Sequence, residues 1–253
     1  MRTELMGPPG VGKTTLYKRV CKERSNAKSW FTPTEFLRKS ALKEIKSKPV
    51  RNVKYASKFL YNSLLKRSDL YKVSDDILQK YCESYSSFFQ HVTECVATPG
   101  KEEYRRLKGY ELFIKTIKQI ALIEETNKTE HIVFDEGLTQ RAFALIPWIA
   151  SCEDLFSTYY KLCPAPETVI LIYGDPETIT KRVIKRNNET GRLIPGHRGL
   201  SLTELQESIS LTQKFMCKGA KILSNRGVKI VEINSMEASH NPVENVSYIL
   251  NNS

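Results

Sequence analysis

The chain has 253 residues, of which 40% are hydrophobic and 26% are charged. This composition is typical of a folded globular protein, and a chain of this length can close one substantial core, so extensive disorder is excluded. No apolar run approaches the roughly 20 residues that a membrane helix needs, and a Gly-Pro-Pro-Gly turn comes too early for a signal peptide, so we predict a cytoplasmic protein with no membrane contact.

The formal net charge of +11 is concentrated in one segment. Between Lys18 and Lys72 there are sixteen Lys or Arg and four Asp or Glu, a surplus of twelve that accounts for the whole excess. A basic segment of this kind attracts phosphorylated ligands or nucleic acid through long-range electrostatics. The alternative is a solvated basic helical face, because charge runs usually lie at the surface.

The N-terminal half is predicted to begin with a strand, a loop and a helix and to continue as helices. Arg2 to Met6 is a short strand-like run that leads directly into glycines, and Thr14 to Cys21 has helical character. From Ala41 to Glu125 apolar residues recur at helical spacing, with breaks near Pro49 and Pro99-Gly100. This region is therefore predicted to be all-helical.

The second half is predicted to alternate strands with helices. His131 to Asp135 and Thr168 to Tyr173 are compact apolar runs, which is typical of buried parallel strands. The remaining predicted elements are a helix from Pro176 to Arg186 after the N-cap Asp175, a helix from the Ser201/Glu204 capping box to about Asn225, and a last strand from Val228 to Ile233.

Strands that alternate with helices predict an α/β fold with a parallel sheet between two helical layers. We expect one domain over residues 1–253, in which residues 38–125 form a large helical insertion. The chain shows no internal repeat and no low-complexity linker, so the sequence gives no sign of a second domain.

One motif carries specific chemistry. Gly7 to Thr14 matches G-x-x-x-x-G-K-[ST] at every specified position, between a predicted strand and a predicted helix. Its backbone N–H groups wrap phosphates, Lys13 reaches the β- and γ-phosphates, and the Thr14 hydroxyl binds Mg²⁺. The motif thus predicts ATP and Mg²⁺ as cofactors. The predicted nucleotide contacts are Gly7, Gly10, Val11, Gly12, Lys13, Thr14 and Thr15, the last through the α-phosphate.

Two carboxylates follow the predicted strand at His131 to Asp135. Asp135 stands where a second acidic element of such a site holds Mg²⁺ directly or through water, and the alternative is a helix cap. Glu136 is placed to accept the proton of an acceptor hydroxyl, and the alternative is a surface glutamate in the first turn of a helix. We predict Asp135 as a metal ligand and Glu136 as a candidate base.

Four arginines follow the strand that ends at Tyr173. Arg182 and Arg186 are one helical turn apart and share a face, and Arg192 and Arg198 come soon after. Guanidinium groups neutralise the charge that spreads over a transferring phosphoryl group, so we predict a phosphate clamp with residues 186–200 as a short lid. The alternative is a solvated basic loop.

These residues resemble the nucleoside monophosphate kinase and adenylate kinase-like group of P-loop kinases, which is related to thymidylate and deoxynucleoside kinases. The resemblance rests on Asp175-Pro176-Glu177, on Arg182 to Arg186 (R-V-I-K-R), on Gly191-Arg192 and on His197-Arg198. It implies about five strands in the order 2-3-1-4-5. It also implies arginines that contact adenine and phosphates, with Arg198 on the nucleotide, and adenine packed on Asn234 to Glu237.

This sequence matches the acceptor-binding motifs of that group poorly. Glu35-Phe36-Leu37-Arg38 is similar to its G-D-x-L-R, which implies Arg38 as an acceptor ligand. The sequence after Asp135 lacks the usual spacing, and Arg141 is the candidate to act from a shifted place, unless it is a surface arginine. The acceptor therefore stays open among nucleotides, nucleosides and sugar-like alcohols.

Three functions are compatible with these motifs. The first is a kinase that moves the γ-phosphoryl group of ATP to a small acceptor. The second is a polynucleotide end kinase, suggested by the basic segment 18–72. The third is a switch ATPase that acts on a partner, suggested by Glu136 beside Asp135.

Overall fold

A computed structural model of the chain describes residues 1–24, 29–44, 75–99, 103–126, 129–146, 152–191, 197, 199–236 and 242–251. These ranges contain a five-stranded sheet in the order β2-β3-β1-β4-β5, and all its paired strands are parallel. The predicted α/β class and strand order are therefore confirmed. The strands are β1 (Arg2–Met6), β2 (Trp30–Phe31), β3 (His131–Phe134), β4 (Thr168–Tyr173) and β5 (Lys229–Asn234).

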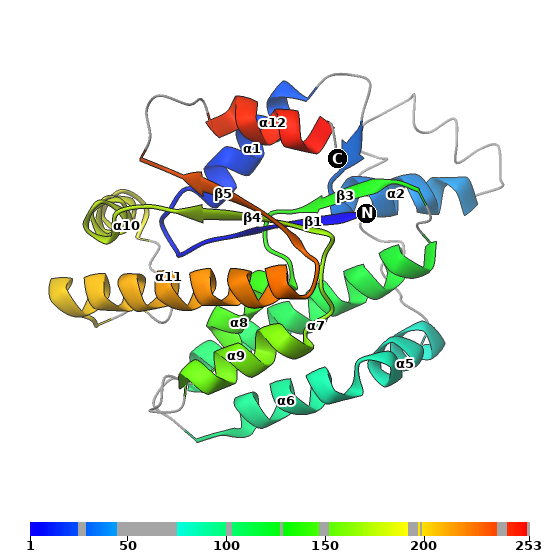
Figure 1. The fold of residues 1–253 in the computed structure, drawn as a ribbon, viewed down its shortest axis with the longest axis horizontal. Coiled ribbons are helices and arrows are strands. Elements are labelled where there is room, and N and C mark those ends of the chain that lie inside the picture. The colour runs from blue at the N-terminus through cyan, green and yellow to red at the C-terminus, as the bar shows by residue number, and fades with distance from the viewer. Residues whose placement is uncertain are drawn as a thin grey trace.

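Helices cover both faces of the sheet (Figure 1). The helices α1 and α12 lie on one face, whereas α7, α8, α9 and α11 lie on the other, and α5 and α6 pack beneath them on α7 and α9. The bounds are α1 (Lys13–Glu23), α2 (Pro33–Glu44), α5 (Asp75–Ser84), α6 (Ser86–Ala97), α7 (Glu103–Thr126), α8 (Leu138–Leu145), α9 (Cys152–Leu162), α10 (Pro176–Thr190), α11 (Leu202–Asn225) and α12 (Pro242–Asn251).

The central strand β1 is buried along its whole length. Thr3 is paired with Val133 of β3 on one side and with Thr168 of β4 on the other. Two apolar cores lie on opposite faces of the sheet, one containing Leu5 and the other Met6. Because β1 is central, the loop that follows it lies at the carboxyl edge of the sheet, where ligands bind in open α/β folds.

Two elements differ from the sequence predictions, and one local feature agrees with them. The helix α10 continues to Thr190 instead of Arg186, because Gly191 takes a left-handed conformation (φ 64°) that ends it one turn later. The strand β2 was not identified, since a two-residue strand shows no periodicity. The capping box is present as predicted, with Ser201 and Glu204 bonded reciprocally at the start of α11.

Within the ranges that the structure describes, no helix is both long and apolar enough to span a membrane. The long helices α7 and α11 are each 24 residues, but they carry charged residues along their length. They pack instead against neighbouring helices under the sheet, α7 on α8 and α11 on α9 (Figure 1).

Candidate active site

The loop between β1 and α1 is shaped by its glycines. Gly10 (φ 89°) and Gly12 (φ 106°) both take the left-handed conformation that side chains disfavour. A Cβ atom at Gly7 would collide with the carbonyl oxygen of Ile172 at the end of β4. Gly12 precedes α1 and has no side chain to cap it, so the first N–H groups of this helix remain available to an anion.

Lys13 is folded back over this loop. Its side-chain Nζ donates to the carbonyl oxygens of Gly7 at 2.6 Å and of Pro8 at 3.3 Å, and the residue is 6% exposed. Burial lowers the pKa of Lys13 to about 8, the carboxylates of Glu136 and Asp135 oppose this shift, and the Arg186 guanidinium adds to it. The ammonium group therefore lies close to the predicted metal ligand and to the predicted phosphate clamp.

Asp135 follows β3, which neighbours β1. Burial raises the pKa of Asp135, and a hydrogen bond with the Thr14 side chain opposes that shift. Its Oδ1 atom is buried and has no hydrogen-bond partner among the described residues. A hydroxyl beside a carboxylate with an unused oxygen is a donor set that suits Mg²⁺, which prefers hard oxygen ligands. The residues present thus fit the implied metal.

Two arginines of α10 face the same loop. Arg182 donates from Nη1 to the Val11 carbonyl at 3.5 Å and from Nη2 to the Met236 sulfur at 3.6 Å. The Nε and Nη2 atoms of Arg186 are buried without a hydrogen-bond partner in the described part of the chain. Burying unpaired N–H donors costs free energy unless a ligand accepts hydrogen bonds from them. The arrangement therefore favours binding of an anionic ligand.

The other lid arginines cannot be placed, because Arg192 and Arg198 lie outside the described residues. Between them His197 is described and is 2% exposed. Its pKa is lowered to about 4 by burial and by the charges of Arg186 and Arg105, so this ring is neutral near pH 7.

A cavity of about 660 Å³ is lined by the phosphate-binding loop, Lys13, Thr14, Arg182 and Arg186. This volume lies within the range of roughly 300–1,000 Å³ that is usual for small-molecule sites. One wall is the loop with the start of α1, and Arg182 and Arg186 stand beside it. The lining residues from α7, α8 and the turn before α8 are Arg105, Lys108, Gly109, Leu112, Glu136, Gln140, Arg141, Phe143 and Ala144.

Glu136 and Arg141 form a pair on the α8 wall. The Arg141 guanidinium donates to the Glu136 carboxylate at 3.0 Å, to the Glu136 carbonyl at 3.3 Å and to the Thr116 hydroxyl at 3.1 Å. Arg141 is thus a cavity residue, with 12% of its side chain exposed, and Glu136 is its partner.

The second predicted acceptor ligand, Arg38, lies on α2 and is not among the described residues that line the cavity. Glu35 in the same motif accepts from Arg24 at 2.7 Å. Of the predicted adenine loop, Ser235 lines the cavity and Met236 contacts Arg182, whereas Glu237 lies outside the described residues.

Sequence reasoning missed Gln140. Its side-chain oxygen accepts from the Gly7 N–H at 3.1 Å, although 133 residues separate the two in the chain. The position of Gln140 soon after Asp135 was its one sequence signal. Arg19, Arg105 and Lys108 were missed as well, and they add positive charge to the cavity lining.

The chain matches no family model and no curated protein. Solved structures of a deoxyadenosine kinase from M. mycoides are similar to it. The structure with bound dATP has 13% sequence identity, a coverage of 99% of this chain and 100% of that chain, and a TM-score of 0.45. The structure with dCMP and dCDP has 14% identity, 100% and 99% coverage and a TM-score of 0.41. Similarity at this sequence identity and TM-score gives no information about activity. The assignment of the fold therefore depends on the observed strand order and not on these structures.

Proposed function

We propose that this protein is a P-loop kinase that transfers the γ-phosphoryl group of ATP, with Mg²⁺, to a small acceptor such as a nucleotide, a nucleoside or a sugar-like alcohol. The supporting observation is that Lys13, Thr14 and Arg186 line one cavity at the carboxyl edge of the sheet, with Asp135 hydrogen-bonded to Thr14. A phosphoryl-transfer site consists mainly of such positioning and charge neutralisation.

On the donor side the loop binds the triphosphate. The N–H groups from Gly10 to Thr15 and the N-terminus of α1 face the phosphate oxygens, and Lys13 exchanges its two loop carbonyls for the β- and γ-phosphates. Thr14 and Asp135 hold Mg²⁺, which neutralises charge on the β- and γ-phosphates when bound. Thr15 contacts the α-phosphate.

Arginines stabilise the charge that develops during transfer. Arg182 and Arg186 approach the γ-phosphoryl group from α10, and the unused Nε and Nη2 donors of Arg186 suit its equatorial oxygens. In the lid at residues 186–200, Arg192 takes the same role and Arg198 contacts the nucleotide, while residues 234–237 pack on the adenine. The helical insertion at 38–125 contributes the acceptor side.

On the acceptor side Arg141 and Glu136 act as a unit. Arg141 binds the acceptor, and Glu136 accepts the proton of its hydroxyl group. The hydroxyl oxygen forms a bond to the γ-phosphorus while the bond from that phosphorus to the β-γ bridging oxygen breaks, and ADP leaves. Arg38 is a further candidate ligand from α2.

The decisive experiment incubates the protein with γ-labelled ATP, Mg²⁺ and separate pools of nucleosides, nucleotides, sugars and oligonucleotides. We expect label on one small acceptor. Label on oligonucleotides alone would favour the polynucleotide end kinase, which the basic segment 18–72 suggests. Free phosphate alone would favour the switch ATPase. Absence of nucleotide binding would overturn all three.

A matched pair of variants on α10 tests the clamp. Arg186→Ala should lower transfer about a hundredfold, the usual loss when one transition-state donor is removed. Lys181→Ala removes a cation from the same helix, but Lys181 is exposed and bonded to Glu177 at 2.6 Å, so transfer should not change. Equal effects of the two variants would contradict the assignment of Arg186.

A further inference from the structure

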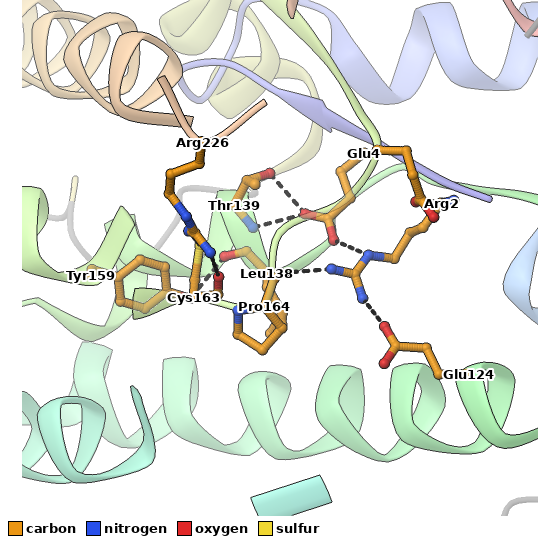
Figure 2. Close-up of polar contacts among 10 residues, drawn as sticks. Arg2, Glu4, Glu124, Leu138, Thr139, Tyr159, Cys163, Pro164 and Arg226 are labelled. Carbon is orange, nitrogen blue, oxygen red and sulfur yellow. Dashed lines mark hydrogen bonds and ion pairs between the residues drawn. The ribbon is translucent and has the colours of Figure 1, made fainter. Parts of the chain in front are cut away.

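Glu4 is a carboxylate with no exposure to solvent in the middle of the central strand. Its Oε2 atom accepts from both the N–H and the hydroxyl of Thr139, each at 2.8 Å. Its Oε1 atom lies 3.2 Å from Nε of Arg2, and Figure 2 draws this ion pair as a dashed line. A buried charge of this kind is tolerated only when it is paired and hydrogen-bonded, and Glu4 is both.

Arg2 is itself held in place. Its guanidinium donates to the Glu124 carboxylate of α7 at 2.5 Å and to the Pro164 carbonyl at 2.6 Å (Figure 2). The Glu4 carboxylate is therefore fixed between an anchored arginine and the first turn of α8. Because β1 leads directly into the phosphate-binding loop, this anchor lies three residues before Gly7.

The turn before α8 is shaped to fit Glu4. A Cβ atom at Gly137 would collide with the carboxyl carbon, the Oε2 atom and the Cγ atom of Glu4. The φ of Gly137 is −90°, which any residue adopts, so glycine is required here by the close approach and not by the backbone conformation. On the far side two buried hydroxyls, from Tyr159 and Tyr160, donate to the carbonyls of Leu138 and Thr139. The start of α8 is thus fixed from both sides.

The next residues of α8 belong to the site. Gln140 follows Thr139 directly and bonds the Gly7 N–H, while Arg141 bonds Glu136. A displacement of the first turn of α8 would therefore move the contact with the phosphate-binding loop and the acceptor-side pair together.

We propose that Glu4 is a positioning residue, which through Thr139 sets the first turn of α8 so that Gln140 holds the Gly7 amide of the phosphate-binding loop. The effect on catalysis rests on the proposed function, whereas the coupling from Glu4 to Gly7 does not. The group acts through α8 and does not touch the substrate.

The test uses near-isosteric variants. Glu4→Gln keeps the shape of the side chain but replaces one acceptor oxygen with an NH₂ group. That NH₂ group must face either the Arg2 guanidinium or the Thr139 donors, so either the contact with Arg2 or the contact with Thr139 is lost. Thr139→Val removes only the hydroxyl donor, and Thr139→Ser restores it. Glu124→Gln is the control, because it also removes a carboxylate from Arg2, whereas Glu124 forms no hydrogen bond or ion pair with α8 among the described residues.

The first readout is hydrogen exchange of the Gly7 amide, followed by NMR in the nucleotide-free protein. We expect exchange to become about tenfold faster in Glu4→Gln and faster to a lesser degree in Thr139→Val, as a weakened hydrogen bond implies. Thr139→Ser and Glu124→Gln should match the parent protein. In a Gln140→Ala background, Glu4→Gln should have no further effect, since the bond that it controls is already gone.

Unchanged Gly7 exchange in Thr139→Val and in a folded Glu4→Gln, or faster exchange in Thr139→Ser, would overturn the proposal. The second readout is the transfer rate. Glu4→Gln should lower kcat about tenfold with little change in nucleotide KM, whereas Glu124→Gln should leave both unchanged. A failure of the parent protein to bind ATP would refute the proposed function but would leave the amide result to decide the coupling.

Discussion

Binding of Mg-ATP should be accompanied by proton uptake at Lys13. In the nucleotide-free protein burial holds the pKa of Lys13 at about 8, well below its ordinary value of 10.5. A bound triphosphate places several negative oxygens beside the ammonium group and so favours its charged form. The pKa of Lys13 should then return toward its ordinary range, and protons must be taken from the buffer at any pH where the free lysine is partly neutral.

The magnitude follows from that pKa. With a value of about 8 in the free protein, about 0.1 of Lys13 is neutral at pH 7 and about 0.5 at pH 8, so uptake should rise by about 0.4 proton per nucleotide bound. The γ-phosphate of ATP titrates below pH 7, so it does not contribute to the rise in proton uptake between pH 7 and pH 8. Calorimetry at both pH values, in buffers of different ionisation enthalpy, measures the number directly.

Lys13→Arg is the matched variant for this measurement. Arginine keeps the positive charge but does not lose its proton in this pH range, so the rise in uptake between pH 7 and pH 8 should vanish while binding persists. Uptake in the parent protein that stays constant across the interval, or a rise that persists in Lys13→Arg, would refute the reasoning. In that case another group would be the one that titrates.

Three further predictions concern the metal, the packing and the effect of pH. Asp135→Asn should abolish transfer without changing the midpoint of thermal unfolding, because it removes the negatively charged side chain that binds the metal together with Thr14. Undiminished activity would remove Asp135 from the proposed site. Gly219→Ala should lower the free energy of unfolding by about 1–3 kcal/mol in urea titrations, because the new Cβ meets the Tyr160 ring; a higher midpoint would contradict this. His131 is buried with a pKa of about 4, so the unfolded chain binds the extra proton and stability should fall as pH drops from 6.5 to 4, with a flatter slope in His131→Gln.

The parts of the site that are local in sequence were predictable. A strand, a glycine-rich loop and a helix follow one another within 22 residues, from Arg2 to Glu23, and each shapes its neighbour directly. The strand order was also predictable, because it came with the resemblance that these motifs carry. Asp135 could be predicted to lie near the loop because a carboxylate at the end of an apolar parallel strand lies at the same sheet edge as the loop; its role in the site stays a prediction.

The acceptor side was less predictable, because its geometry depends on contacts between distant segments. Arg38 was chosen from a local likeness to a motif, yet the described cavity is lined instead by α7 and α8. Gln140 reaches Gly7 only because the sheet places β1 beside the turn after β3. Neither helical spacing nor charge in the sequence reports such a contact.

The strand β1 shows why the two charged residues in the centre of the sheet were overlooked. Arg2, Thr3 and Glu4 are three consecutive polar residues, which is unusual for a buried central strand, yet all five residues of β1 are buried. A buried ion pair often adds little to stability compared with apolar residues of the same size. The pair lies directly before the phosphate-binding loop, and Oε2 of Glu4 accepts two hydrogen bonds from Thr139, so orientation of α8 explains the pair better than strength of the core does.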